Sequence, residues 1–176
     1  MGAMVETKGS ADAMKTAGGD ELLQLVTFNL GNEDYAVAIL KVQEINRMKE
    51  ITRVPNAPPY VEGVINLRGK VIPVVNLRSK FGLAAKENNE QTRIMIMDIQ
   101  GITMGLVVDS VSEVLRIPSS TVEPTPPMAS NISAEFIKGI AKVDERLIIL
   151  LDMDRLLGKA GGEEMLEVAT KAIENK

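Results

Sequence analysis

The chain has 176 residues, of which 45% are hydrophobic, and a net charge of −4 at pH 7, with no histidine and no cysteine. It is long enough for one ordinary domain or two small ones, whereas disulfides, thiol nucleophiles, histidine bases and ordinary zinc sites are excluded. Scarce aromatic residues on an acidic background disfavour nucleic-acid binding. With no long apolar run and no signal-peptide pattern, we expect no membrane insertion, no cofactor and a cytoplasmic location.

The first ordered element is predicted to be a β-hairpin. Residues 1–20 are rich in Gly, Ala and Lys without a sustained period, which indicates a disordered N-terminal tail. Apolar residues then alternate along residues 25–30 and again along 35–39, and residues 31–34 between them have turn composition. This alternation is typical of two half-buried strands.

A second hairpin follows in the same half. Residues 64–67 and 71–75 are apolar, β-branched runs on either side of Gly69, which can take the positive φ of a tight turn. Pro73 predicts an edge strand or a bulge, because proline donates no hydrogen bond to a ladder. Residues 76–81 are a candidate short helix that Gly82 ends.

The second half repeats this order of elements. Hairpins are predicted at residues 93–108 and 136–151, and a short helix at 152–157. Two matches show the duplication: Val42-Gln43-Glu44-Ile45 corresponds to Val111-Ser112-Glu113-Val114, 69 positions later, and Gly63 corresponds to Gly139, 76 positions later. Met95, Met97 and Met104 lie on alternating strands and are expected to fill the core or the contact between the copies.

The repeat predicts an all-β (mainly β) fold of two tandem small barrels. Each copy supplies about five short strands, and we place the barrels at about residues 22–84 and 92–158. A unit of ~60 residues is marginal alone, so the barrels should share an apolar interface. A C-terminal amphipathic helix is predicted at 161–176, with Met165, Leu166 and Ala169 along one side.

Several strings resemble one known family. They are Phe28-Asn29-Leu30-Gly31, Val54-Pro55, and the run from Gly63-Val64-Ile65-Asn66-Leu67-Arg68-Gly69 to Val71-Ile72-Pro73-Val74. Together they closely resemble the CheW chemotaxis coupling proteins. The resemblance extends over a domain at about residues 21–166. It implies two five-stranded, SH3-like barrels packed on a shared hydrophobic seam.

The resemblance also implies a function and partners. Proteins of this family carry no catalytic activity and bridge the cytoplasmic tips of methyl-accepting receptors to the regulatory domain of a CheA-type histidine kinase. By position, the expected kinase-binding residues are Val42, Glu44, Ile45 and Phe136, and the expected receptor-binding residues are Gly63 and Arg68. Because such contacts tend to be small and weak, we expect a monomer when no partner is bound.

Plainer interpretations compete with these roles. Arg68 could be a solvated turn charge, Glu44 a rim charge of little energetic weight, and Gly63 a backbone requirement. A carboxylate enzyme would need a close pair such as Asp98 with Asp109. An oligonucleotide-binding small barrel is the other alternative function.

Overall fold

The computed structural model describes residues 21–124, 136–157 and 165–170. The predicted N-terminal tail therefore lies outside the described residues, as does much of the predicted C-terminal helix. Within the described ranges no helix has the length and apolar character needed to cross a membrane.

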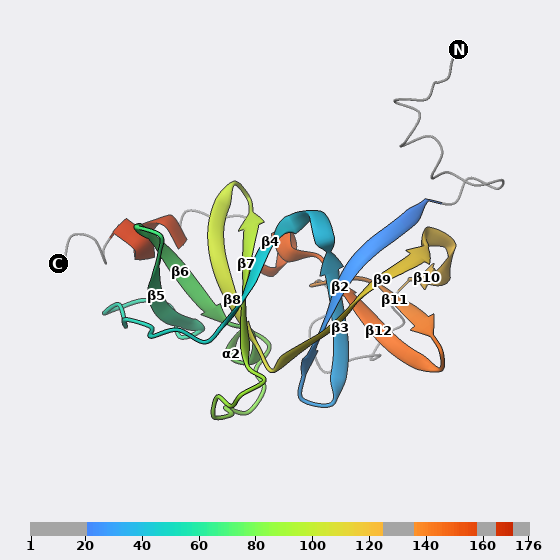
Figure 1. Ribbon diagram of the computed structural model, residues 1–176, viewed down its shortest axis with the longest axis horizontal. Helices are drawn as coiled ribbons and strands as arrows, with labels where there is room; N and C mark the ends of the chain where they lie inside the picture. The colour runs from blue at the N-terminus through green and yellow to red at the C-terminus, as the bar shows by residue number, and fades with distance from the viewer. Residues whose placement is uncertain (1–20, 125–135, 158–164, 171–176) are drawn as a thin grey trace, which may run out of the picture.

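Two β-sheets lie side by side along the long axis of the molecule (Figure 1). The six-stranded sheet has the order β10-β11-β12-β3-β2-β9; its strands are β2 (Leu22–Leu30), β3 (Glu33–Ala38), β9 (Ser110–Pro118), β10 (Val122–Glu123), β11 (Ile137–Val143) and β12 (Arg146–Leu151). The five-stranded sheet has the order β4-β7-β8-β6-β5; its strands are β4 (Val42–Arg47), β5 (Val61–Leu67), β6 (Lys70–Asn76), β7 (Arg93–Ile99) and β8 (Ile102–Val108). The predicted all-β fold with two barrel units is confirmed, and the two-residue β10 is the additional strand.

The predicted boundaries of the barrels are wrong, because the two copies exchange their first hairpins. The β2–β3 hairpin of the first copy pairs with β9 and β12 of the second, and the β7–β8 hairpin of the second copy pairs with β4 and β6 of the first. Neither barrel is therefore a continuous stretch such as 22–84 or 92–158. Alternation and turns define strands and hairpins, but the choice of the next neighbour depends on tertiary packing, which a local pattern does not contain.

The duplication itself is confirmed by matching irregularities. The pairing of β4 with β7 skips Gln43, and the pairing of β2 with β9 skips its counterpart Ser112. A second bulge skips Glu62 in β5 and its counterpart Lys138 in β11. Bulges are local, specific distortions, so their recurrence at the same two places shows that one structural unit was copied.

A shared hydrophobic seam holds the two barrels together. In β7, Met95 and Met97 point into the seam and are fully buried, whereas Ile94 and Ile96 point into the separate core of the five-stranded barrel. The seam also contains Met104 and, from the six-stranded sheet, residues such as Phe28 and Tyr35. The predicted position of the three methionines is confirmed. Because central strands bury both faces, the barrels form one body.

The tight turns follow from residues that take positive φ. Arg68 and Gly69 both do so at the tip of the β5–β6 hairpin, with φ of 52° and 87°, as do Asp144 and Glu145 in the corresponding turn of the second copy. Two-residue turns of this kind match the twist of the paired strands. Pro73, in contrast, does not lie in an edge strand: β6 is flanked by β5 and β8. Its missing donor is tolerated because the parallel ladder to β8 starts only at Val74.

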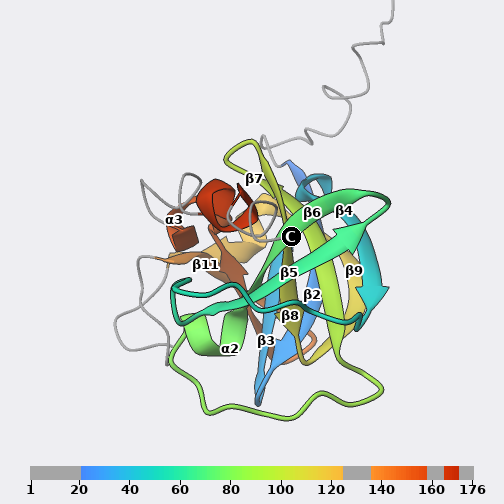
Figure 2. The same cartoon turned by 90° about the vertical axis from the view of Figure 1, so that its left-hand side faces the viewer.

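Short helices close the two copies. α2 (Leu77–Lys80) begins after Asn76, whose side chain accepts a hydrogen bond from the Ser79 amide at 3.2 Å. α3 (Met153–Leu157) follows Asp152 in the same way. A further helix at residues 165–170 lies at the outer end of the five-stranded sheet (Figure 2). It buries Met165 and Val168, while Leu166 is exposed, so the predicted inward side was partly wrong.

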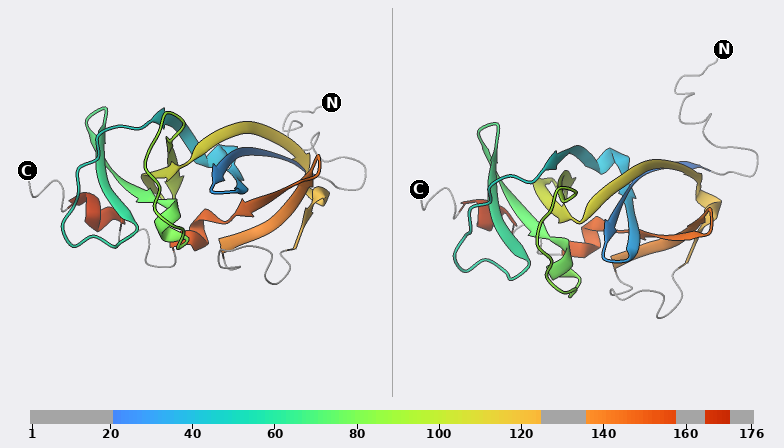
Figure 3. Two further views of the ribbon diagram at one scale, coloured as in Figure 1. Left: turned by 90° about the horizontal axis from the view of Figure 1, so that it is seen from below. Right: turned by 60° about the horizontal axis from the view of Figure 1, so that its bottom comes forward.

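Among the described strands, the chain passes from one sheet to the other at two places. The 3-10 turn η1 (Ile39–Lys41) leads from β3 into β4, and Asp109 leads from β8 into β9. Seen from below, β9 arches from the five-stranded sheet along the outer side of the six-stranded one (Figure 3). The η1 crossing lies next to the surfaces that could bind partners, because it leads into β4 and contributes Ile39 and Leu40 to a groove.

Candidate functional site

The first candidate surface is the free edge of the five-stranded sheet. Among the described strands β4 pairs only with β7, so one side of β4 has no neighbour in the sheet. The bulge at Gln43 changes the direction of the strand just before Glu44. Ile45, the next residue in β4, is exposed, so a charged and an apolar residue follow one another along this edge. We call Glu44, Ile45 and Arg68 the β4 surface.

Glu44 and Arg68 form an ion pair across this surface. The Arg68 guanidinium donates to both carboxylate oxygens of Glu44, and Nη1 lies 3.5 Å from Oε1. The hydrogen bond from Arg68 lowers the pKa of Glu44 and raises that of Arg68. The Arg68 side chain remains 71% exposed and that of Glu44 27% exposed. A pair so accessible contributes little to stability, and it remains available to a partner.

The structure unites residues that were assigned to different partners. Glu44 was expected at the kinase contact and Arg68 at the receptor contact, yet they touch and form one surface. Val42 lies at the start of β4, half-buried against the seam. Sequence patterns could not reveal this contact. In the sheet, β4 is separated from β6 and β5 by β7 and β8, which come from the other copy of the repeat.

Of the other two expected site residues, Gly63 is buried and Phe136 is half-buried. Gly63 is buried, and a Cβ there would lie 2.1 Å from the carbonyl oxygen of Thr52. A backbone requirement therefore explains the glycine, because any side chain at position 63 would collide with the backbone of Thr52. Phe136 is half-buried in the seam, with its ring stacked on Phe81 at a centroid distance of 6.1 Å. It packs against the same seam as Val42, and it is not part of the Glu44–Arg68 pair.

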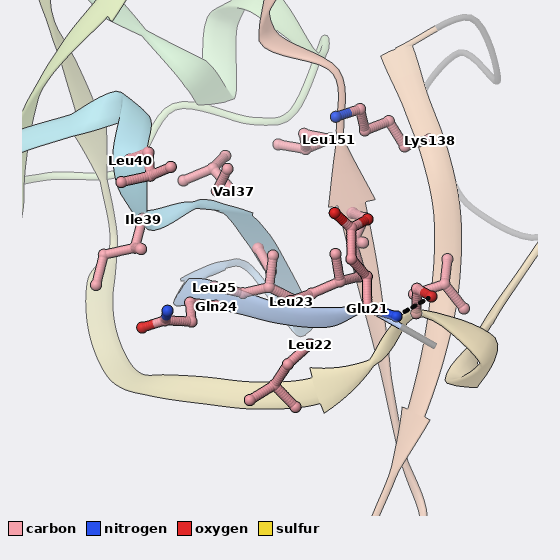
Figure 4. Close-up of a pocket in the computed structure, with 15 residues that line it drawn as sticks. Glu21, Leu22, Leu23, Gln24, Leu25, Val37, Ile39, Leu40, Lys138 and Leu151 are labelled. Carbon is pink, nitrogen blue, oxygen red and sulfur yellow. Dashed lines mark hydrogen bonds between the residues drawn. The ribbon is translucent and has the colours of Figure 1, made fainter. Parts of the chain in front are cut away.

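The second candidate surface is an apolar groove of about 580 Å³ in the six-stranded barrel (Figure 4). Its apolar lining includes Leu22, Leu23, Leu25, Val37, Ile39 and Leu40 from the start of β2, the end of β3 and η1, together with Leu150 and Leu151 of β12. Glu21 and Lys138 add charge to it. The Glu21 amide donates to the hydroxyl of Ser119 at 3.3 Å, which ties the start of β2 to η2 (Ser119–Thr121).

Leu40 is the functional candidate that sequence reasoning missed. It lines the groove and is 96% exposed, although it is a large apolar residue. The signal was present, because Ile39 and Leu40 are adjacent apolar residues and a strand can bury only one of two neighbours on a single face. An exposed leucine beside an apolar groove is typical of a protein-binding surface.

A second ion pair repeats the first in the other barrel. Arg146, near the tip of the β11–β12 hairpin, donates to Glu113 at 2.7 Å and lies 3.8 Å from Asp34. Glu113 is the counterpart of Glu44 in the duplication. The repeat could not have indicated this pair from sequence, because the offset of 76 matches Arg68 with Asp144 and not with Arg146. Asp109, considered as half of a catalytic pair with Asp98, binds Arg78 instead.

Comparison with known proteins decides the family. The protein-family model of the CheW-like domain matches residues 24–161. The chain belongs to the CheW-like family. It is 37% identical over 157 residues to the chemotaxis protein CheW of Klebsiella aerogenes, covering 89% of this chain and 93% of that protein. With the CheW of Helicobacter pylori it shares 36% identity, covering 86% and 92% of the two chains.

A CheW-like structure also shares the fold. The scaffolding protein TtCheW from Thermoanaerobacter tengcongensis matches with a TM-score of 0.73 and 39% sequence identity, covering 79% of this chain and 90% of that one. The CheW-like match includes the β4 surface and most of the groove, leaving out Glu21, Leu22 and Leu23. The alternative of an oligonucleotide-binding barrel is not favoured by these similarities.

Proposed function

We propose that the chain is a non-enzymatic adaptor that couples methyl-accepting chemotaxis receptors to a CheA-type histidine kinase. Membership of the CheW-like family supports this role, since relatives are chemotaxis proteins and a similar structure is a scaffolding protein. Such an adaptor works in the cytoplasm and is a monomer when free. Its partners are proteins, and neither a cofactor nor nucleic acid takes part.

The observation that carries the proposal is the presence of two separate surfaces with different chemistry on one body. The β4 surface belongs to the five-stranded barrel and combines an ion pair with an exposed isoleucine. The groove belongs to the six-stranded barrel and is mostly apolar. Because the seam joins the barrels firmly, an adaptor of this form holds two partners at a fixed spacing.

The β4 surface suits the regulatory domain of the kinase. A charge pair at an exposed strand edge selects a complementary partner, and the adjacent Ile45 supplies an apolar anchor. Arg68 presents a fork of donors that lysine cannot copy. In this proposal Glu44, Ile45 and Arg68 act together, and Val42 supports them from the start of β4.

The groove suits the receptor tip. Mostly apolar side chains line it, and Leu40 among them is almost fully exposed, so the groove favours the apolar side of an elongated partner. Lys138 offers a cation to a carboxylate at the rim. Burying Leu40 on binding would supply up to about 2–3 kcal/mol of hydrophobic free energy.

Two binary titrations test this division. We expect Glu44→Lys to weaken binding of an isolated kinase regulatory domain by about tenfold or more, since it places a second cation beside Arg68. The matched control is Glu113→Lys, the same charge change on the corresponding strand, which should leave kinase binding unchanged. Leu40→Glu should weaken binding of a receptor fragment and spare the kinase domain.

Each titration has an outcome that contradicts the proposal. Equal losses for Glu44→Lys and Glu113→Lys would show that net charge, and not the β4 surface, governs kinase binding. Full receptor binding by Leu40→Glu would remove the groove from the receptor contact. Circular dichroism melting curves establish that each variant is folded. Leu40 and Glu44 are accessible enough that their variants should retain the wild-type melting temperature.

A further inference from the structure

The two crossings between the barrels are counterparts in the duplication, yet they carry different residues. Leu40 in η1 and Asp109 after β8 are 69 positions apart, which is the offset that relates β4 to β9. One crossing therefore holds an exposed leucine where the other holds a carboxylate. A copied unit starts with equal parts, so the difference points to separate tasks for the two crossings.

The Asp109 crossing is tied to both barrels. Its carboxylate accepts two hydrogen bonds from Arg78, at 2.9 Å from Nε and 2.7 Å from Nη2, and one from the Gly31 amide at 2.8 Å. Arg78 belongs to α2, which follows the five-stranded sheet, and Gly31 is in the β2–β3 turn of the six-stranded sheet. Arg78 also donates to the Ala84 carbonyl at 2.6 Å.

This arrangement is well shielded and charge-assisted. Both side chains are only 16% exposed. Partial burial alone would raise the pKa of Asp109, but the hydrogen bonds from Arg78 and Gly31, with the Arg78 charge, hold that pKa below its usual value. A two-bond guanidinium–carboxylate pair has a defined plane, so it resists rotation as well as separation. We call Arg78, Asp109 and Gly31 the clasp.

The opposite crossing has a much looser counterpart. Asp154 occupies the position that corresponds to Arg78, 76 residues earlier, and it pairs with Lys41, whose Nζ lies 4.0 Å from the carboxylate. The side chains of Lys41 and Asp154 are 45% and 56% exposed. Gln100, the counterpart of Gly31, donates to the backbone oxygen of Asp154 at 2.9 Å. A solvated pair at this distance fixes little.

We propose that Arg78 and Asp109 are positioning residues that set the angle between the barrels. The seam is apolar and opposes separation of the barrels, and because hydrophobic attraction has no preferred direction, a directed polar contact adds its own constraint on rotation. The clasp supplies the missing direction on one side only. It thereby sets the spacing between the β4 surface on one barrel and the groove on the other, both of which adjoin the η1 crossing.

The effect of the clasp on assembly with two partners rests on the proposed function, whereas its effect on the angle between the barrels does not. Neither Arg78 nor Asp109 lines the groove or belongs to the β4 surface. Loss of the clasp should therefore leave the affinity for each single partner intact. It should reduce formation of the ternary complex, in which the chain holds kinase domain and receptor at a fixed spacing. A residue with a merely structural role would lower the melting temperature without this separation of binary from ternary binding.

Distance measurement between the barrels tests the proposal directly. The chain has no cysteine, so Lys70→Cys on the five-stranded sheet and Lys142→Cys on the six-stranded sheet can carry two spin labels at exposed positions. Pulsed electron–electron double resonance should give one narrow distance distribution for the parent. Arg78→Lys, which keeps the charge but not the two-bond plane, should broaden the distribution at least about twofold.

A matched control and a second variant keep the test decisive. Lys41→Ala at the loose crossing should leave the distribution narrow, and Asp109→Asn, which retains an acceptor for Gly31, should broaden it. Unchanged width in both clasp variants would overturn the proposal, as would equal broadening by Lys41→Ala.

The failure of the clasp and the failure of the adaptor function give different results. If the clasp variants broaden the distribution but the parent binds no partner, the adaptor function fails while the clasp stands. If the distribution stays narrow in the clasp variants and the parent binds both partners, the clasp fails while the adaptor function stands.

Discussion

Replacement of Gly63 by alanine should destabilise the protein more than any other single methyl addition at a hairpin of the five-stranded sheet. Gly63 has a φ of 149°, and an added Cβ would lie 2.1 Å from the Thr52 carbonyl oxygen. Thr52 and Val64 exchange two backbone hydrogen bonds of 2.8 Å at this point. The methyl group would push Thr52 away and break this bridge.

The cost follows from these contacts. Two backbone hydrogen bonds are worth about 1 kcal/mol each, and an alanine held at unfavourable φ adds about 1–3 kcal/mol. We expect a loss of roughly 3–5 kcal/mol in the free energy of unfolding, or on the order of 10 °C in melting temperature for a chain of this size. Far-ultraviolet circular dichroism is the assay, because the protein has no tryptophan.

The matched control is Gly69→Ala at the tip of the same hairpin. Gly69 has a φ of 87°, and no atom of the described residues lies within 4 Å of an added Cβ, so only the backbone cost of about 1–2 kcal/mol applies. Equal melting temperatures for the two variants would refute the steric reasoning. If Gly63→Ala kept the wild-type melting temperature yet lost receptor binding, the glycine would be a contact residue and not a backbone requirement.

Further predictions concern the seam, the clasp and the β4 surface. Phe28→Ala should cost about 3–5 kcal/mol in urea unfolding, because Phe28 is fully buried and stacks on Tyr35 at 5.8 Å; a loss under about 1 kcal/mol would show that the seam is not closely packed. Asp109 stabilises the folded state at neutral pH, and this contribution should disappear as the pH falls through its lowered pKa, below 3.8. The stability difference between wild type and Asp109→Asn should accordingly shrink from about pH 7 to about pH 2.5, and a constant difference would contradict it. Arg68→Ala should change the unfolding free energy by less than about 0.5 kcal/mol while reducing kinase binding; unchanged binding would exclude Arg68 from the contact.

Local features of the fold were predictable from the sequence. Hairpins, short helices and the repeat follow from alternation, Gly and Pro positions, and the match of Val42–Ile45 with Val111–Val114. Positive φ at Gly69 was expected from glycine itself. Each of these features is encoded within a few neighbouring residues, so tertiary context was not needed to infer them.

Long-range features were not predictable in the same way. The hairpin exchange depends on which sheet accepts β4 after η1, and no periodicity records that choice. The contact of Glu44 with Arg68 and the exposure of Leu40 both result from it. The burial of Gly63 beneath Thr52 also needed the folded chain, since Thr52 lies in a connection whose path the sequence leaves open.

Co-sedimentation across a concentration series of this chain tests the adaptor role most directly. Receptor fragments and the kinase regulatory domain are held at fixed concentrations, and the kinase that sediments with the receptor is measured as the chain is added. A two-sided adaptor predicts a rise followed by a fall, because excess chain occupies each partner separately. Kinase sedimentation that does not depend on the chain, or that only rises to a plateau at large excess, would contradict the account.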